Sequence, residues 1–360
     1  MPLWIDQPAA LRAHLQEPPA WVGLDTEFVR ERTYWPQLAL VQMSIGEQIL
    51  LIDPRVPGMA DALRPLLNDP NVLKVMHSAS EDLVALSHDC GALPAPLFDT
   101  QIAAALCGVG GGMGYQRLVQ EITGVALIKG ETRSDWLRRP LSDSQLEYAA
   151  DDVVHLGAIY HQLDTRLRAL GRRDWLDQDC ARMLANAGED SERWPHLSMR
   201  SSQYLEADAQ LRLLRLLRWR DVQARASDKP RSWILDNDLS TQFARLPPRD
   251  RAHLQTQLDA HPKAPRKLGD AIWEALNTAL DDEQDMPVAR NASSEDKAAL
   301  KRMQDAVSAR ATELGLPDGI LASRRYLESL QETGTWPPSL SGWRRDILQP
   351  ALDPLLPPPQ

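Results

Sequence analysis

Two carboxylates separated by one residue, Asp25 and Glu27, are the first side chains in the sequence that could do chemistry. On an extended strand, residues two apart point to the same face, so we expect both carboxylates on one face. Neighbouring acids repel each other, and their proximity is costly unless a cation lies between them. Apolar Val22, Leu24 and Phe28 flank the pair on the opposite face, which indicates a strand covered by a core.

A third acid, Asp82, lies in the stretch HSASED at 77–82, near the expected start of a helix. That helix should follow a short strand at 72–76. Acids favour the first turn of a helix because of its dipole, so a structural role would also explain this residue. Asp82 gains a chemical interpretation only together with the other acids.

The third group is Tyr148, Asp151 and Asp152. Tyr148 and Asp152 are four residues apart, which places them on one face of a helix, while Asp151 turns away. A carboxylate within an otherwise apolar helix face is costly if it is buried without a partner. A metal ion would be such a partner.

Four carboxylates without a cysteine set or a histidine cluster suit a hard cation with oxygen ligands, namely Mg²⁺ or Mn²⁺. Two such ions about 3.5–4 Å apart can hold the attacking and leaving oxygens of a phosphoryl transfer. We therefore predict Asp25, Glu27, Asp82 and Asp152 as metal ligands. The phenol of Tyr148, beside the last acid, can orient an attacking water.

The elements that must position these residues read as α/β. Alternating or apolar runs predict strands at 21–28, 38–45, 48–52 and 72–76. A tight hairpin is expected between the second and third of these strands. Helical spacing is found at 79–89 and continuously from Ser142 to Leu163. Ser142 and Gln145 form a capping box at the start of that long helix.

The second half of the chain carries helix signals and almost no strand signal. Residues 186–206 have little apolar periodicity and are expected to be a linker. Residues 211–275 hold 13 Lys and Arg against 8 Asp and Glu, a net charge of +5 in a chain of net charge −10. On the helix expected at 211–226, a basic ridge could contact phosphate, or it could simply be a solvated face; its members are Arg212, Arg215 and Arg218.

Composition excludes several classes of protein. The chain of 360 residues is 43% hydrophobic and 25% charged, as in globular proteins. No apolar run approaches the roughly 20 residues that span a bilayer, and the start of the chain lacks the pattern of a signal peptide. Three cysteines without CxxC spacing fit a reducing cytoplasm. The glycine-rich stretch 108–114 lacks the Lys-Ser/Thr of a phosphate-binding loop, so no nucleotide cofactor is expected. Because no apolar run is long enough to span a bilayer, no membrane partner is expected either.

Three ordered motifs give the sequence a clear resemblance. They are WVGLDTEFVRERTYWPQLALVQ at 21–42, KVMHSASEDLVAL at 74–86 and YAADDVVHL at 148–156. In residues 20–165 the chain resembles the ribonuclease D family, within the DEDD exonuclease superfamily. The tyrosine four residues before the last aspartate resembles the tyrosine subclass of that superfamily.

The resemblance implies a role for each acid. Asp25, Glu27 and Asp152 would hold the metal that carries the nucleophilic water. Asp25 and Asp82 would hold the second metal near the leaving 3′-oxygen. Glu27 would also contact the terminal 3′-hydroxyl of the substrate, and Tyr148 would position the water.

It also implies an architecture. An RNase H-like exonuclease domain, a mixed sheet flanked by helices, would occupy 1–185. After the linker at 186–206, residues 207–284 resemble the helicase-and-RNase-D C-terminal (HRDC) domain, a small all-α bundle. Residues 285–360 would be a second, divergent HRDC-like bundle.

The function implied is a cytoplasmic, metal-dependent 3′→5′ exoribonuclease that acts on tRNA precursors with 3′ extensions and releases nucleoside 5′-monophosphates. A DNA 3′→5′ exonuclease with the same chemistry is an alternative, because no motif visibly reads the 2′-hydroxyl. A catalytically silent RNA-binding module is another. Clustered carboxylates that repel phosphate count against that last alternative.

Overall fold

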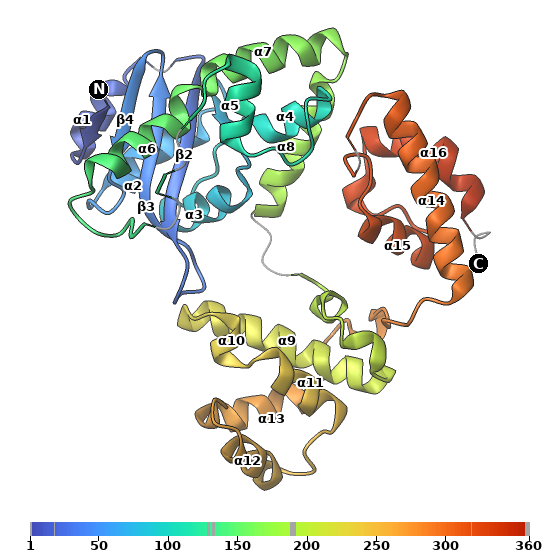
Figure 1. Cartoon of the computed structure of the whole chain (residues 1–360). Helices are drawn as coiled ribbons and strands as arrows, with labels where there is room; N and C mark the ends of the chain where they lie inside the picture. The colour runs from blue at the N-terminus through green and yellow to red at the C-terminus, as the bar shows by residue number, and fades with distance from the viewer. Residues whose placement is uncertain are drawn as a thin grey trace. The chain divides into compact units, whose positions relative to one another are not determined.

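The structure, a computed structural model, describes residues 2–17, 19–127, 130–131, 134–187, 192–317 and 319–356. The chain divides into two compact units. Unit 1 comprises Met1–Val29, Pro36–Glu189 and Ser294–Gln360, and unit 2 comprises Arg30–Trp35 and Asp190–Ser293. The elements of both units are shown in Figure 1.

Unit 1 is built on a six-stranded mixed sheet in the order β1-β4-β3-β2-β5-β6. The strands are β1 (Leu3–Ile5), β2 (Trp21–Val29), β3 (Gln37–Ile45), β4 (Gln48–Ile52), β5 (Leu73–Met76) and β6 (Leu97–Asp99). β2 lies near the middle of the sheet, antiparallel to β3 and parallel to β5. β4 runs antiparallel to β3, β1 runs parallel to β4, and β6 runs parallel to β5. The expected α/β class and its four strands are confirmed, and β1 and β6 are additional short edge strands.

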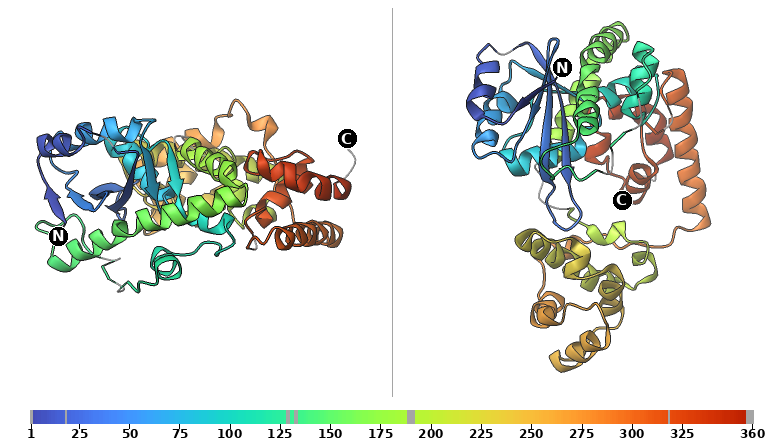
Figure 2. Two further views of the ribbon diagram at one scale, coloured as in Figure 1. Left: turned by 90° about the horizontal axis from the view of Figure 1, so that it is seen from above. Right: turned by 60° about the vertical axis from the view of Figure 1, so that its left-hand side comes forward.

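The helices of unit 1 come from both ends of its sequence. The N-terminal part contributes α1 (Pro8–His14), α2 (Met59–Asn68), α3 (Ser80–Cys90), α4 (Thr100–Leu106), α5 (Tyr115–Thr123), α6 (Asp143–Val154), α7 (Leu156–Ala169) and α8 (Arg173–Ala187). The C-terminal part contributes α14 (Ser294–Glu313), α15 (Arg324–Thr333), α16 (Trp343–Leu352) and the short 3₁₀ helices η5 (Pro338–Leu340) and η6 (Asp353–Leu355). Figure 2 shows α6 and α7 in sequence beside the sheet.

Alternation along β3 explains why both faces of the sheet are covered. Leu40 packs in a cluster with Ala149 of α6, whereas the next residue, Val41, belongs to the main core with Leu83 of α3. Both strand residues are almost completely buried. Because successive strand residues point to opposite faces, α6 and α3 cover opposite sides of the central strands.

The C-terminal helices of unit 1 are attached to α8 through aromatic and charged contacts. The rings of Trp175 and Trp343 stack at 4.4 Å with an angle of 3° between their planes. The buried carboxylate of Asp179 accepts the Trp343 indole N–H at 3.0 Å and an Arg344 N–H at 2.8 Å. These contacts place residues 294–360 in the same compact unit as the sheet.

The glycine-rich turn at 108–114 also packs against the residues that follow α14. Gly108 has a φ of +74°, and a Cβ there would lie 2.5 Å from the Gly315 carbonyl oxygen. A Cβ on Gly111 would lie 3.3 Å from the Pro317 side chain. Glycine is therefore required at 108 for this close approach of two backbone segments.

Unit 2 is helical. Its elements are η1 (Pro195–Ser198), η2 (Ser202–Tyr204), α9 (Ala207–Ser227), α10 (Arg231–Ile234), α11 (Asn237–Arg245), α12 (Arg251–Ala260), η3 (Arg266–Leu268), α13 (Gly269–Asn277) and η4 (Glu283–Asp285). Its core gathers Leu216, Leu235 and Phe243 among other buried side chains. The loop between β2 and β3 belongs to this unit, where the Tyr34 hydroxyl donates to Asp221 at 3.0 Å.

Some elements differ from the sequence expectations. The helix expected from Ser142 to Leu163 is divided at His155 into α6 and α7. Gly157 then lets α7 approach the first residue of β2, because a Cβ there would lie 2.5 Å from the Trp21 ring. In the expected linker, His196 and Ser202 are buried within unit 2. The four-part domain division itself stays a prediction.

Within the part of the chain that the structure describes, no helix combines the length and the apolar character needed to cross a membrane.

Candidate active site

Strand β2 presents Asp25 and Glu27 on one face of the sheet, as the spacing predicts. In the β2–β3 register Asp25 lies opposite Gln42 and Glu27 lies opposite Leu40. The register shifts directly after Glu27, so the ladder is regular up to the second acid. Both acids are therefore held by backbone hydrogen bonds of a central strand rather than by a loop.

Asp82 reaches the site from the first turn of α3. The strand before it, β5, runs parallel to β2, so the chain leaves both strands at the same edge of the sheet. Asp82 is only 8% exposed, and one of its carboxylate oxygens accepts a hydrogen bond from the Thr26 hydroxyl. A neighbour of both acids on β2 therefore orients the third acid.

The completely buried carboxylate of Asp99 fixes the start of α3. One of its oxygens accepts the Ala79 N–H at 2.8 Å, one residue before the helix begins. The other accepts the N–H groups of Gln101 and Ile102 and caps α4. Sequence reasoning missed this residue; an aspartate at a strand end followed by a helix was the available signal.

Helix α6 carries the third group, and its start is confirmed as a capping box. The Gln145 N–H donates to the Ser142 hydroxyl at 3.2 Å, and the Ser142 N–H donates to the Gln145 side-chain oxygen at 3.0 Å. Asp151 is exposed whereas Asp152 is partly buried. The helix face inferred from the spacing is therefore confirmed.

The ring of Tyr148 is closely packed by its neighbours. Gly130 lies so close that a Cβ there would approach the Tyr148 ring to 2.6 Å. The Trp136 ring lies 6.1 Å from that of Tyr148. Burial, followed by the negative charges of Asp152, Glu27 and Asp25, raises the pKa of the Tyr148 phenol, so its hydroxyl stays protonated at neutral pH.

Tyr115 of α5 is a second phenol near the acids that sequence reasoning missed. Its hydroxyl donates to the Asp151 carbonyl at 3.2 Å. Burial and then the charge of Asp152 raise its pKa, and Asp25 also contributes. Tyr115 in turn contacts the edge of the His77 ring, at 5.5 Å between centroids. Tyr115 directly follows the glycine-rich turn, and nothing in that local sequence indicates that its side chain lies near the acids.

Burial raises the pKa of all four carboxyl groups, and repulsion from the other site acids adds to this for Asp25 and Glu27. For Asp25, burial acts first, followed by the charges of Asp82, Asp152 and Glu27. Burial and the charges of Asp152 and Asp82 raise the pKa of Glu27 to about 8. Burial raises the pKa values of Asp82 and Asp152 to about 7. The four predicted acids and Tyr148 are thus close enough to perturb one another.

These side chains fit hard divalent cations by their chemistry. Among the described residues, no lysine or arginine forms an ion pair with Asp25, Glu27 or Asp152. Buried carboxylates without a cationic partner are the kind of ligand that such ions prefer. In the described ranges no three acidic, histidine or cysteine side chains are already gathered into a metal cage. Side-chain rotation would therefore have to close the ligands around a cation.

The arginines predicted to contact substrate lie in unit 2 and are engaged within it. Arg212 donates to a backbone carbonyl of α11 at 2.8 Å. Arg215 pairs with Glu283 at 2.6 Å, and Arg218 pairs with Asp282 at 2.6 Å. Phosphate binding by this ridge would require these bonds to break, and it stays a prediction.

Four other basic residues near the motifs are candidates for phosphate contact, and two of them are described by the structure. Lys129 and Arg133 lie outside the described residues. Arg30 donates to the Tyr34 carbonyl at 2.8 Å, and Arg32 lies 6.0 Å from the centroid of the Trp233 ring. Both of these arginines belong to unit 2, and these contacts lie within that unit.

Comparisons with known proteins agree with this geometry. A sequence family described as 3′-5′ exonuclease matches residues 2–168. Ribonuclease D of Xanthomonas oryzae pv. oryzae is 62% identical over 99% of this chain and 99% of its own. Ribonuclease D of Pseudomonas paraeruginosa is 36% identical over 97% of this chain and 96% of its own.

A solved structure is similar over the same length. The crystal structure of Escherichia coli RNase D superimposes with a TM-score of 0.86 at 30% identity, and the match covers 99% of this chain and 98% of the other. The exonuclease family implies the use of divalent metal ions, in keeping with the acids gathered at β2, α3 and α6. This chain therefore belongs to the ribonuclease D family of 3′→5′ exoribonucleases.

Proposed function

We propose that the four carboxylates hold two divalent cations, Mg²⁺ or Mn²⁺, and that unit 1 uses them to hydrolyse RNA from its 3′ end. The observation that carries this proposal is the gathering of four buried or half-buried acids, whose charges raise the pKa of Asp25 and Glu27, beside a protonated phenol. Bound cations would supply an activated water and stabilise the attacking and leaving oxygens. The products would be nucleoside 5′-monophosphates.

The fold supports a division of labour among the acids. Asp25 is perturbed by all three of the others, which fits a ligand shared between both cations. Glu27 and Asp152 would complete one set of ligands. Asp82, held by Thr26, would serve the cation near the leaving 3′-oxygen.

Two groups would act on water and substrate directly. The Tyr148 hydroxyl, kept protonated and held beside Asp152, would orient the attacking water. Glu27 would also accept a hydrogen bond from the terminal 3′-hydroxyl of the RNA. The site would thereby select a free 3′ end.

The substrate we infer is structured RNA, specifically tRNA precursors with 3′ extensions, in the cytoplasm. Support comes from the Escherichia coli RNase D structure, described as that of an exoribonuclease involved in structured RNA processing. A DNA exonuclease with the same acids is the competing assignment. The two differ in whether the substrate's 2′-hydroxyl matters.

The direct experiment compares the 3′ ends of otherwise identical substrates. We expect a 3′-extended tRNA with a free 3′-hydroxyl to shorten one nucleotide at a time with Mg²⁺ or Mn²⁺ and to stay intact with a chelator. A 3′-phosphate should block digestion, because it adds negative charge beside four acids. Product lengths on a sequencing gel give the readout, with matched DNA in parallel. Rapid cleavage of a circular RNA, or equal turnover of DNA, would contradict the assignment.

The acids can be tested with a neighbouring control. Asp25→Asn or Asp152→Asn removes charge from the cation ligands, so hydrolysis should fall by several orders of magnitude. Asp151→Asn, next in sequence but exposed, should retain activity close to that of the wild type. Initial rates on a 3′-extended RNA, with circular dichroism to verify folding, measure the effect. Wild-type turnover by folded Asp25→Asn would rule out the metal-ligand role.

Tyr148→Phe retains the ring and deletes the hydroxyl. We expect kcat to fall about ten- to a thousand-fold, the range for a positioned proton-transfer or orienting group, while RNA affinity changes little. Tyr160→Phe is the matched control, because Tyr160 packs against Trp21 and Phe98. Single-turnover kinetics separate the rate of chemistry from binding. An unchanged rate in Tyr148→Phe would show that this residue only packs.

A further inference from the structure

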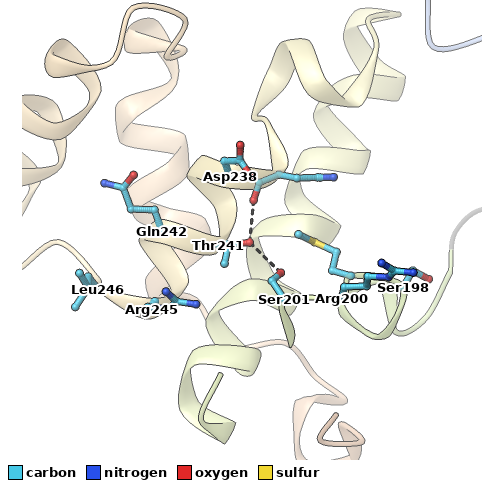
Figure 3. A pocket seen from close by; sticks show the side chains of 10 residues that line it. Ser198, Arg200, Ser201, Asp238, Thr241, Gln242, Arg245 and Leu246 are labelled. Atoms are coloured by element: carbon cyan, nitrogen blue, oxygen red, sulfur yellow. Dashed lines mark hydrogen bonds between the residues drawn. The ribbon is translucent and has the colours of Figure 1, made fainter. Parts of the chain in front are cut away.

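A pocket of about 490 Å³ in unit 2 lies between two segments that are distant in sequence. One wall is formed by residues 198–201 around the end of η1, and the other by α11 and the residue after it, 237–246. A hydrogen bond of 3.2 Å between the hydroxyls of Ser201 and Thr241 joins the two walls. Thr241 also donates to the Asn237 carbonyl at 2.9 Å, which fixes its hydroxyl in the lining of the pocket. Figure 3 shows this arrangement.

Two arginines of this pocket differ from the other arginines described above. Arg200 and Arg245 are both exposed, and neither guanidinium has a hydrogen-bond or ion-pair partner among the described residues. Figure 3 shows them on opposite sides of the Ser201–Thr241 pair. By contrast, Arg215 is already paired with a carboxylate. The positive charges of these two arginines are thus available to a ligand at this pocket.

The remaining lining indicates the kind of ligand. Besides the hydroxyls, the pocket presents the amide of Gln242, a single carboxylate, Asp238, and the 67% exposed side chain of Leu246. Free guanidinium groups bind phosphate oxygens through two parallel hydrogen bonds, and hydroxyls can donate further ones. Small-molecule sites enclose most of their ligand, whereas most of these side chains are exposed. An open, cationic and polar surface of this kind suits a chain of phosphates.

We propose that Arg200 and Arg245 bind the phosphodiester backbone of RNA, in a contact separate from the active site. The proposal rests on the assignment of RNA as the substrate. It replaces the ridge of Arg212, Arg215 and Arg218, whose guanidiniums are engaged internally. The site reads phosphate and not base, so it contributes affinity for RNA without sequence preference.

The test is RNA binding by the full-length protein, with a chelator present so that no hydrolysis occurs. We expect Arg200→Gln/Arg245→Gln to bind a single-stranded RNA more weakly at low salt, with affinities that converge with the wild type at high salt. The slope of log affinity against log salt should decrease by about 0.7 for each phosphate that the protein no longer neutralises. Filter binding across a salt series measures both quantities.

Two further variants isolate the pocket. Arg251→Gln/Arg266→Gln removes the same charge from exposed arginines of unit 2 that are already paired with acids. It should leave the slope unchanged. Arg200→Lys/Arg245→Lys keeps the charge and should keep most of the slope, which covers the possibility that the glutamine variant does not fold.

Hydrolysis of a chromogenic nucleotide ester with Mn²⁺ reports the active site independently. We expect the same rate in the wild type and in all three variants. A wild-type affinity and slope in Arg200→Gln/Arg245→Gln, or an equal reduction in Arg251→Gln/Arg266→Gln, would overturn the pocket proposal. Failure of the wild type to hydrolyse both the ester and RNA would instead overturn the proposed function.

Discussion

The repulsion between four carboxylates is the constraint on which the rest of unit 1 depends. The charges of Glu27, Asp82 and Asp152 make ionisation of Asp25 more costly, and those of Asp152 and Asp82 do the same for Glu27. Burial adds to this cost, because it removes the water that would stabilise the charges. Such a cluster persists only where the surrounding fold holds the backbone firmly. A cation of the kind we propose would turn the same repulsion into attraction, which links metal binding to the stability of the site.

Three sets of contacts hold the backbone segments that carry the acids. Hydrogen bonds to β3 and β5 hold β2 on both sides, and α6 starts at a complete capping box. Asp99 anchors the chain just before α3, and Thr26 then orients Asp82. The main core continues without interruption into the C-terminal helices, where Trp175 stacks on Trp343. The helices farthest from the acids in sequence therefore belong to the same packed body.

The sequence predicts the acids well because their spacing has a direct geometric meaning. A separation of two on a strand, or of four on a helix, determines a shared face, and the structure shows Asp25, Glu27, Tyr148 and Asp152 arranged in this way. Tyr115 and Asp99 escaped prediction, because their roles depend on long-range packing that leaves no local period. The ridge of Arg212, Arg215 and Arg218 shows what helical spacing leaves out. Helical spacing predicted a shared face, but acids 64 or more residues away in sequence pair with two of these arginines.

The most direct test of this account is the thermal unfolding midpoint of the metal-free wild type and of Asp25→Asn, with and without Mg²⁺. The folded protein holds more protons on these acids than the unfolded chain, so the metal-free stability should fall as pH rises from about 4 to about 8. At about pH 8.5 without metal, Asp25→Asn should therefore unfold at a higher temperature than the wild type, and the difference should shrink towards pH 5. Mg²⁺ should raise the midpoint of the wild type and scarcely that of the variant. A variant that is less stable than the metal-free wild type at that pH, and that responds equally to Mg²⁺, would contradict the account.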